Sequence, residues 1–192
     1  MVLSDREIRA AIERKALLIV PDPPPEAWTS TAVDLTLDKE LRRWKVLSDH
    51  GKESVIRPLS KNFNFTALAK ENSEAFDISA DGWTINPGDF VLGWTVERIQ
   101  LPYKSRIAAR VEGKSSLARL GVGVHVTAPT IHAGFGYNPQ TPDKGNTIQL
   151  EIHNVGPLSI KLEKGMAICQ LIFEEVHGTP EKGYEGQFAK QH

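Results

Sequence analysis

The chain of 192 residues lacks the features that define several classes of protein. Its single cysteine, Cys169, has no partner for an intrachain disulfide, so we expect a reducing, cytoplasmic setting. No N-terminal apolar run resembles a signal peptide, and no apolar stretch is long enough to span a membrane. With 23 basic and 24 acidic residues the formal net charge is -1, which gives no overall positive field for a nucleic acid. We therefore expect neither a membrane nor a nucleic-acid partner.

The composition is that of an ordinary globular protein. With 40% hydrophobic and 24% charged residues, the chain is long enough to bury a substantial core, and we expect residues 1–192 to form one domain. Ser4 and Glu7 have the spacing of a capping box, which predicts an N-terminal helix. That helix must end before Pro21, because the proline-rich segment of residues 21–25 lacks backbone donors.

Short strands are predicted for most of the remaining chain. Gly88 and Gly165 each occupy a turn where a hairpin needs a positive φ. A short helical turn at residues 115–120 is the one internal helix that the pattern indicates. The fold class predicted is mainly β, a sandwich or jelly roll with an N-terminal helix and one short internal helix. Alternating or β-rich runs place strands at residues 33–38, 106–111, 148–154 and 158–163.

The turn after Gly113 collects groups that can bind an anion. Lys114, Ser115, Ser116 and Arg119 provide two cations and two hydroxyls beside free backbone N–H groups. Ser115 and Arg119 are four residues apart and share a helical face. Two interpretations stay open: a phosphate-binding turn, or a capped surface helix with solvated cations. A Walker A loop is excluded, because the glycine required five residues before Gly113 is an alanine.

The strand of residues 148–154 has one apolar and one polar face. Ile148, Leu150 and Ile152 alternate with the polar residues Gln149, Glu151 and His153. The polar face either meets water or lines a pocket. His125 and His132 lie in the same part of the chain, but neither an HExxH helix nor paired cysteines are present, so we predict no metal site. The zinc nucleobase deaminases are excluded as well, because they need two nearby cysteines.

Four segments resemble, in order and spacing, the dCTP deaminase branch of the trimeric dUTPase family. They are GKSSLARLG (113–121), VHVTAPTIHAGF (124–135), QLEIHN (149–154) and GYEGQ (183–187). The similarity extends to the N-terminal helix, the proline segment and AVDLTL, so it covers nearly the whole chain. The resemblance implies a distorted, dUTPase-like β jelly roll and a homotrimer with shared active sites. It further implies dCTP and dUTP as ligands, dTTP as a candidate inhibitor, Mg²⁺ bound with the triphosphate and no catalytic metal.

The resemblance assigns the chemistry to Glu151. Deaminases of this family carry a glutamate three residues before the strand-end asparagine, here Asn154, where plain dUTPases usually carry an aliphatic residue. Glu151 would deprotonate a water that attacks C4 of cytosine and would relay protons to N3 and to the departing ammonia. A carboxyl that both takes and gives protons near neutrality needs an enclosed site that raises its pKa.

The resemblance also assigns supporting roles to other residues. Those that position the water are Ser115, Arg119 and the backbone carbonyl of Ala128. Those that bind the triphosphate are Lys114, Ser116 and Arg119. Gln149 and Leu150 read the base, largely through main-chain groups.

Two segments depart from the family pattern. His132 stands where relatives usually carry an aspartate that contacts the deoxyribose and, in dUTPases, activates the attacking water. We therefore expect hydrolysis of a phosphoanhydride to be disfavoured, while His132 either donates to the 3'-hydroxyl or only fills space. Residues 136–147 form a longer loop than the family's usual turn, and a lid, a subunit contact and a passive loop are all open.

The C-terminal tail, about residues 178–192, resembles the segment that closes over the triphosphate in this family. Gln187 carries over from the motif. The lysine that usually precedes the tyrosine is Gly183 here, with Lys182 one residue earlier.

The predicted function is the metal-independent hydrolytic deamination of dCTP to dUTP and ammonia. One alternative is a bifunctional enzyme that continues to dUMP, or a plain dUTPase. Another, from a different class, is a non-catalytic nucleotide-binding regulatory trimer, which would gain nothing from Glu151.

Overall fold

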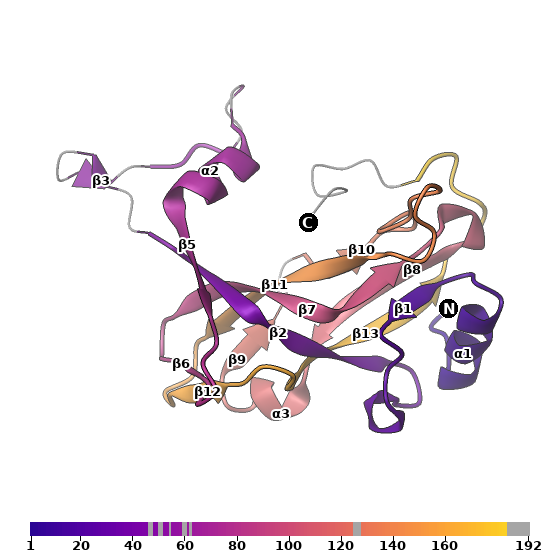
Figure 1. Cartoon of the computed structure of the whole chain (residues 1–192), viewed down its shortest axis with the longest axis horizontal. Coiled ribbons are helices and arrows are strands. Elements are labelled where there is room, and N and C mark those ends of the chain that lie inside the picture. Colours follow the sequence, from indigo (N-terminus) through magenta and orange to yellow (C-terminus); the bar gives the residue numbers. More distant parts are fainter. Residues whose placement is uncertain are drawn as a thin grey trace.

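The computed structural model describes residues 1–45, 48–49, 52–53, 55–58, 61, 63–124 and 128–183 (Figure 1). No helix among them is long and apolar enough to cross a membrane. In chain order the elements are α1 (Asp5–Glu13), β1 (Leu18–Val20), η1 (Pro25–Ala27), β2 (Val33–Trp44), β3 (Ser48–Asp49), β4 (Lys52–Glu53), α2 (Phe65–Asn72), β5 (Ser73–Asp77), β6 (Trp83–Ile85), β7 (Phe90–Gln100), η2 (Tyr103–Ser105), β8 (Ile107–Gly113), α3 (Ser115–Ala118), β9 (Val122–Val124), β10 (Thr130–Ile131), β11 (Asn146–Asn154), β12 (Ile160–Leu162) and β13 (Ala167–Glu175).

One curled antiparallel sheet organises the molecule. Its strand order is β10-β8-β13-β2-β7-β11-β9, with β1 added to β7 and β5 added to β2. The four-residue helix α3 joins β8, near one end of this order, directly to β9 at the other end. The sheet therefore curls until its ends meet: a Cβ placed on Gly113 would lie 3.9 Å from the backbone nitrogen of Val124. The predicted mainly β, distorted jelly-roll architecture is confirmed.

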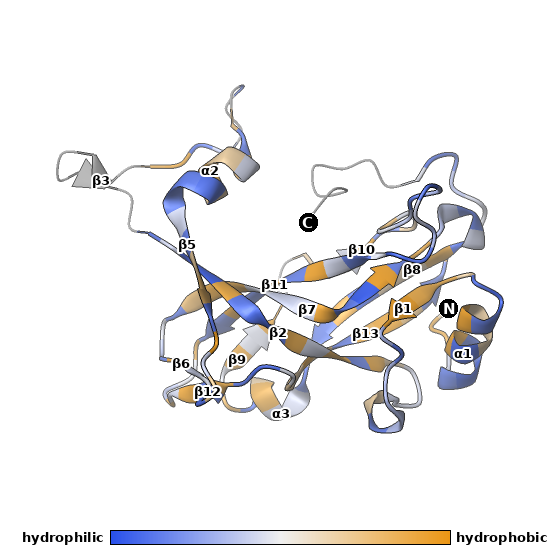
Figure 2. Ribbon diagram, in the orientation of Figure 1, coloured by the Kyte–Doolittle hydropathy of each residue, from blue (hydrophilic) through white to orange (hydrophobic). Residues whose placement is uncertain are grey.

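The core is filled by apolar side chains from every second residue of the strands. On β2 the side chains of Val33, Leu35 and Leu37 are completely buried while the residues between them are not. The strands of the sheet accordingly show apolar and polar residues in turn along their length (Figure 2). Each inward side chain removes apolar area from water, which stabilises the fold by roughly 25 cal/mol for each Å² buried.

The start of the chain folds as its capping residues predict. The Ser4 hydroxyl oxygen accepts a hydrogen bond from the backbone nitrogen of Glu7 at 3.3 Å, and α1 buries Ile8 and Ala11 against the sheet. The proline segment forms a connector that includes η1. Gly88 and Gly165 have φ values of 87° and 81°, so both predicted left-handed turns are confirmed.

The sequence interpretation did not anticipate α2. Its cap is Asn64, whose side-chain oxygen accepts from the backbone nitrogen of Ala67 at 3.0 Å. None of its side chains is buried, so it lacks the apolar stripe by which a helix is usually predicted. In Figure 1 this helix projects from the body of the molecule at the far end of β5.

Asn154 fixes the end of β11. Its buried amide donates to the backbone oxygens of Ile85 at 3.1 Å and Leu158 at 2.7 Å, and its side-chain oxygen accepts from the nitrogen of Gly156 at 3.0 Å. Beside it, Gly121 has a φ of 93°, and a Cβ there would lie 2.2 Å from the Cα of Gly156. This packing ties the chain that leaves α3 to the end of β11.

We predict that Asn154→Ala destabilises the protein by about 3 kcal/mol, because three hydrogen bonds of about 1 kcal/mol each are lost. Chemical denaturation measures the change. Asn138→Ala is the control, since that side chain accepts one exposed hydrogen bond, from Gln140. Equal effects of the two substitutions would contradict the prediction.

Candidate active site

Glu151 lies on the polar face of β11, between β7 and β9. Leu150 and Ile152 are completely buried, so the pleat directs Gln149, Glu151 and His153 to the opposite face. Across the ladder to β7, Glu151 lies opposite Leu92, which is also buried. The carboxylate thus stands beside apolar surface.

The environment of Glu151 changes its acidity. The side chain is half-buried, and this burial raises the pKa of the carboxyl above its ordinary value of 4.5. A backbone hydrogen bond opposes the shift and is the smaller influence. Desolvation penalises the charged form, so the carboxyl keeps its proton to higher pH than a solvated glutamate does. A raised pKa is what a group that accepts and returns protons needs.

His153, on the same face, packs against the main chain. A Cβ placed on Gly123, its partner on β9, would lie 2.4 Å from Nε2 of His153. The glycine therefore makes room for the imidazole ring. Of the other two histidines of the region, His132 is exposed and His125 lies outside the described residues. In the described part of the chain, no three His, Cys, Asp or Glu side chains are grouped as metal ligands.

The anion-binding turn predicted after Gly113 forms α3. The backbone oxygen of Lys114 accepts from the nitrogens of Leu117 at 3.0 Å and Ala118 at 2.9 Å, while Ser115, Ser116 and Arg119 are exposed. The turn begins where β8 approaches β9, and Val124 of β9 pairs with Ile152, the neighbour of Glu151. The start of the turn therefore lies beside β9, the strand that pairs with β11.

Lys114 has a partner that the sequence interpretation missed. Its Nζ forms an ion pair with Oδ2 of Asp34 on β2. The alternation of residues 33–38 indicates that Asp34 faces outward, but no sequence spacing relates it to a lysine 80 residues away. The structure thus places a carboxylate on the cation that was expected to bind the triphosphate.

Ala128 and His132 flank β10. The nitrogen of Val111 donates to the oxygen of Pro129 at 2.8 Å, which holds the segment after Ala128 to β8. The turn after His132 is held by the residue that follows β7: the nitrogen of Gly134 donates to the oxygen of Leu101 at 2.6 Å. This hydrogen bond anchors the backbone of the turn. The side chain of His132, at the start of the turn, is exposed.

The described part of the tail returns to the same turn. A Cβ placed on Gly183 would lie 3.2 Å from the ring of Tyr103 and 3.8 Å from the Cα of Gly134. Lys182 is exposed and adjacent to this contact. Gln187 lies outside the described residues. The chain thus approaches the turn that follows His132.

The longer loop is fastened at its base. The Arg98 guanidinium on β7 donates to the backbone oxygens of Lys144 and Gly145, both at 2.9 Å. Gly136 and Gly145 pack closely against the backbone of Ile99, where a Cβ on Gly136 would meet the carbonyl oxygen at 2.1 Å. Residues 137–144 between these anchors are exposed.

Comparison with known proteins identifies the family. Residues 2–176 match the model of the family described as dCTP deaminase-like. The chain is 37% identical over 194 residues to the "dCTP deaminase, dUMP-forming" of Pseudarthrobacter chlorophenolicus, and the match covers 100% of this chain and 90% of that protein. It is 33% identical over 183 residues to the protein of the same name from Methanosphaera stadtmanae, with 95% and 83% covered. The chain belongs to the dCTP deaminase-like family.

A solved structure shares the fold. The crystal structure of 2'-deoxycytidine 5'-triphosphate deaminase from Agrobacterium tumefaciens superposes with a TM-score of 0.65 at 20% sequence identity. The match covers 92% of this chain but 48% of that chain, so this chain spans about half the length of that protein. This similarity concerns the architecture.

We predict that Glu151→Gln gains thermal stability relative to the wild type as pH rises. Because burial raises the pKa of Glu151, the folded protein binds this proton more tightly than the unfolded chain does. Below the unfolded pKa both states are protonated; above the raised folded pKa, the charged wild-type carboxyl costs stability that glutamine does not.

Calorimetric Tm values from about pH 4 to about pH 8 test this, since the range brackets an ordinary glutamate pKa. The exposed Glu163→Gln is the control for the loss of a glutamate charge outside the site. A Tm advantage of Glu151→Gln that shrinks with rising pH would mean that the carboxyl is not desolvated.

Proposed function

We propose that the protein hydrolyses the bond between C4 and the amino nitrogen of dCTP and releases ammonia, with Glu151 as the general base. The observation that carries this proposal is the half-buried Glu151, whose pKa is raised beside Leu92 on the polar face of β11. Membership of the dCTP deaminase-like family supports it. A non-catalytic nucleotide-binding trimer would not need a carboxyl with a raised pKa.

The proposed reaction moves two protons through Glu151. The carboxylate takes a proton from water as the water oxygen bonds to C4, and this proton passes to N3 of the ring. The carboxylate restored by this transfer then takes the one proton of the added hydroxyl and gives it to the amino group, so that the C4–N bond breaks, the C4=O bond forms and ammonia leaves. General acid–base assistance of this kind contributes about 10² to 10⁴-fold to the rate.

The remaining site residues take supporting roles in the proposal. The Ser115 hydroxyl, the Arg119 guanidinium and the Ala128 carbonyl hold the water against Glu151. Ser116, Lys182 and Gln187 contact the phosphates. The exposed side chains of α3 are available to a neighbouring subunit, which agrees with a homotrimer that shares its sites.

Main-chain groups of β11 take part in the proposal as well. Gln149 and Leu150 read the base, largely through their backbone groups. Backbone N–H and C=O groups of a strand can hydrogen-bond to a ligand, as they do with an added peptide.

Mg²⁺ enters the proposal with the nucleotide. The described residues offer no cluster of carboxylates for a resident ion, whereas triphosphate oxygens are the hard ligands that Mg²⁺ prefers. The cytoplasmic setting and inhibition by dTTP are likewise proposals from the sequence.

The names of the relatives favour dUMP as the final product. Both relatives described above are called dUMP-forming, which supports the bifunctional alternative over the dUTP product that the sequence interpretation preferred. One observation favours the dUTP-forming enzyme: His132 occupies the position of the usual aspartate, and imidazole lacks the charge with which a carboxylate orients a Mg²⁺-linked water. We propose the dUMP-forming reaction and retain the dUTP-forming one as the second candidate.

Ammonia and pyrophosphate, measured separately after incubation with dCTP, distinguish these functions. We expect equal amounts of both from the wild type, and a fall in ammonia release of at least about 10²-fold in Glu151→Gln with the oligomer unchanged on gel filtration. Glu163→Gln should be fully active. Ammonia without pyrophosphate would select the dUTP-forming enzyme, and no ammonia at all would refute deamination.

We predict that His132→Asp increases pyrophosphate release from dUTP by about tenfold, because a carboxylate orients the attacking water better than imidazole. Ammonia release from dCTP should change little. His132→Asn, which is uncharged, is the control and should not gain. If His132→Asp is slower than the wild type on dUTP, the histidine itself takes part in hydrolysis.

A further inference from the structure

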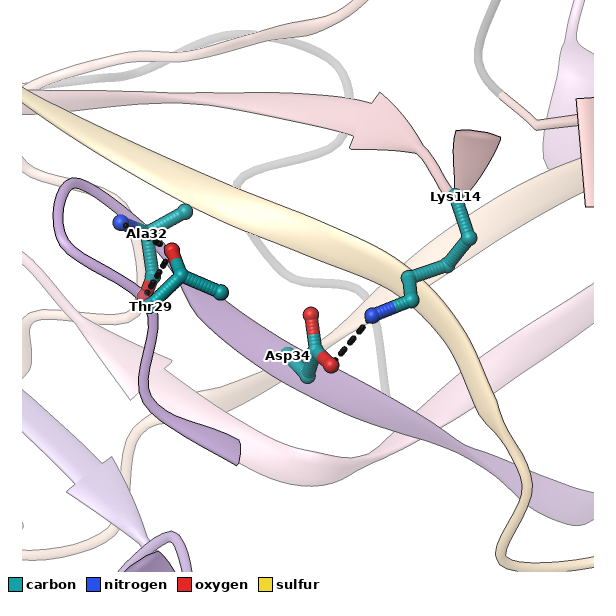
Figure 3. Close-up of polar contacts among 4 residues, drawn as sticks. All are labelled: Thr29, Ala32, Asp34 and Lys114. Atoms are coloured by element: carbon teal, nitrogen blue, oxygen red, sulfur yellow. Dashed lines mark hydrogen bonds and ion pairs between the residues drawn. The ribbon is translucent and has the colours of Figure 1, made fainter. Parts of the chain in front are cut away.

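The ion pair between Lys114 and Asp34 spans a strand. β13 lies between β2 and β8, and the register aligns Asp34 with Gln170 of β13 and Glu112 of β8. Lys114 is two residues beyond Glu112 and shares its face of the sheet. Figure 3 shows the lysine side chain crossing β13 to reach Asp34. The pair therefore fastens the end of β8 to β2, two strands away.

This pair is more sheltered than a surface salt bridge. The side chains of Lys114 and Asp34 are 23% and 13% exposed. Oδ1 of Asp34 is buried and has no hydrogen-bond partner in the described part of the chain. An ion pair that leaves a buried oxygen unsatisfied adds little net stability, because desolvation offsets the attraction. What it supplies is a defined position for the lysine.

The Asp34 end of the pair is rigid. Its strand neighbours Val33 and Leu35 are completely buried. Just before them, the Thr29 hydroxyl donates to the oxygen of Ala32 at 3.1 Å and accepts from its nitrogen at 3.0 Å (Figure 3). This turn leads directly into β2, so Asp34 has little freedom to follow a moving lysine.

The position of Lys114 determines where α3 begins. Its backbone oxygen receives the first hydrogen bonds of the helix, from Leu117 and Ala118. A shift of Lys114 therefore moves the turn that carries Ser115 and Arg119. Because Asp34 neutralises the ammonium group, Lys114 also brings little net positive charge to a triphosphate.

We propose that Asp34 is a positioning residue, which holds Lys114 across β13 and thereby places Ser115 and Arg119 for the reaction. In this role Lys114 is a structural cation and does not bind the triphosphate. The inference rests on the proposed deamination, in which Ser115 and Arg119 hold the attacking water. It adds a residue outside the site and reassigns one that was expected inside it.

Steady-state ammonia release from dCTP and dCMP by Asp34→Asn, Lys114→Met and the double variant tests the proposal. Each single variant should lower kcat about tenfold and change KM less than about twofold, as loss of an orienting contact does. The double variant should be no worse than the singles. The losses should be the same for dCTP and dCMP, and Lys114→Arg, which keeps the pair, should retain most of the activity.

A phosphate-binding lysine gives the opposite pattern and would overturn the proposal. Lys114→Met would then raise KM for dCTP and not for dCMP, while Asp34→Asn would leave KM unchanged or lower it. The control is the pair formed by Arg106 and Glu175 at the other end of β8 and β13, with 2.9 Å between Nη2 and Oε1. Arg106→Met and Glu175→Gln should leave kcat unchanged.

Thermal unfolding separates failure of this inference from failure of the proposed function. If the wild type deaminates no cytosine nucleotide, the function is wrong, but the coupling of the pair is still measurable. The Tm losses of the single variants should then exceed that of the double variant, because each single leaves one buried charge without its partner. Additive losses would refute the structural link.

Discussion

The pleat of β11 is the constraint on which the candidate site depends. The side chains of Leu150 and Ile152 are completely buried in the hydrophobic core, and each stabilises the fold by about 2 kcal/mol relative to exposure. A shift of register by one residue would expose both and force the Glu151 carboxyl into the core. Asn154 and Gly156 fix the end of the strand against such a shift. The position of the carboxyl thus follows from the packing of its apolar neighbours.

The curling of the sheet determines where the polar side chains of α3 lie. Because α3 has only four residues, β8 and β9 must approach one another, and the hydroxyls and guanidinium of α3 are presented where they meet. Lys114 fixes the start of this turn through Asp34. The tail reaches the neighbouring turn at Gly134. The described part of the tail thus meets the turn that follows β10, while α3 leads into β9, the neighbour of β11.

Local rules predicted the elements that have a simple pattern. Alternation identified β11 and the start of β2, and the capping box identified α1. β2 continues to Trp44, well past the alternating residues, because pairing with β5 extends it, and such pairing is not visible in the strand's own sequence. α2 was missed because a helix without buried side chains has no apolar periodicity, although Asn64 is a recognisable cap.

The candidate site was likewise predicted from the sequence only in part. Alternation placed Glu151 on a polar face but could not show whether that face was solvated; resemblance to a family gave the carboxylate its chemical role. Its half-burial depends on tertiary packing beside Leu92. The link from Asp34 to Lys114 depends on which strands flank β13, and only the folded sheet reveals it.

The measurement that bears most directly on the account is the titration of the Glu151 carboxyl by carbon-13 NMR, assigned by comparison with Glu151→Gln. It should be recorded with and without an imido analogue of dUTP that resists hydrolysis. The account predicts a titration midpoint above 4.5 that changes when the nucleotide binds. A midpoint at or below this value, unaffected by nucleotide, would show a solvated carboxylate away from the base and would contradict the central claim.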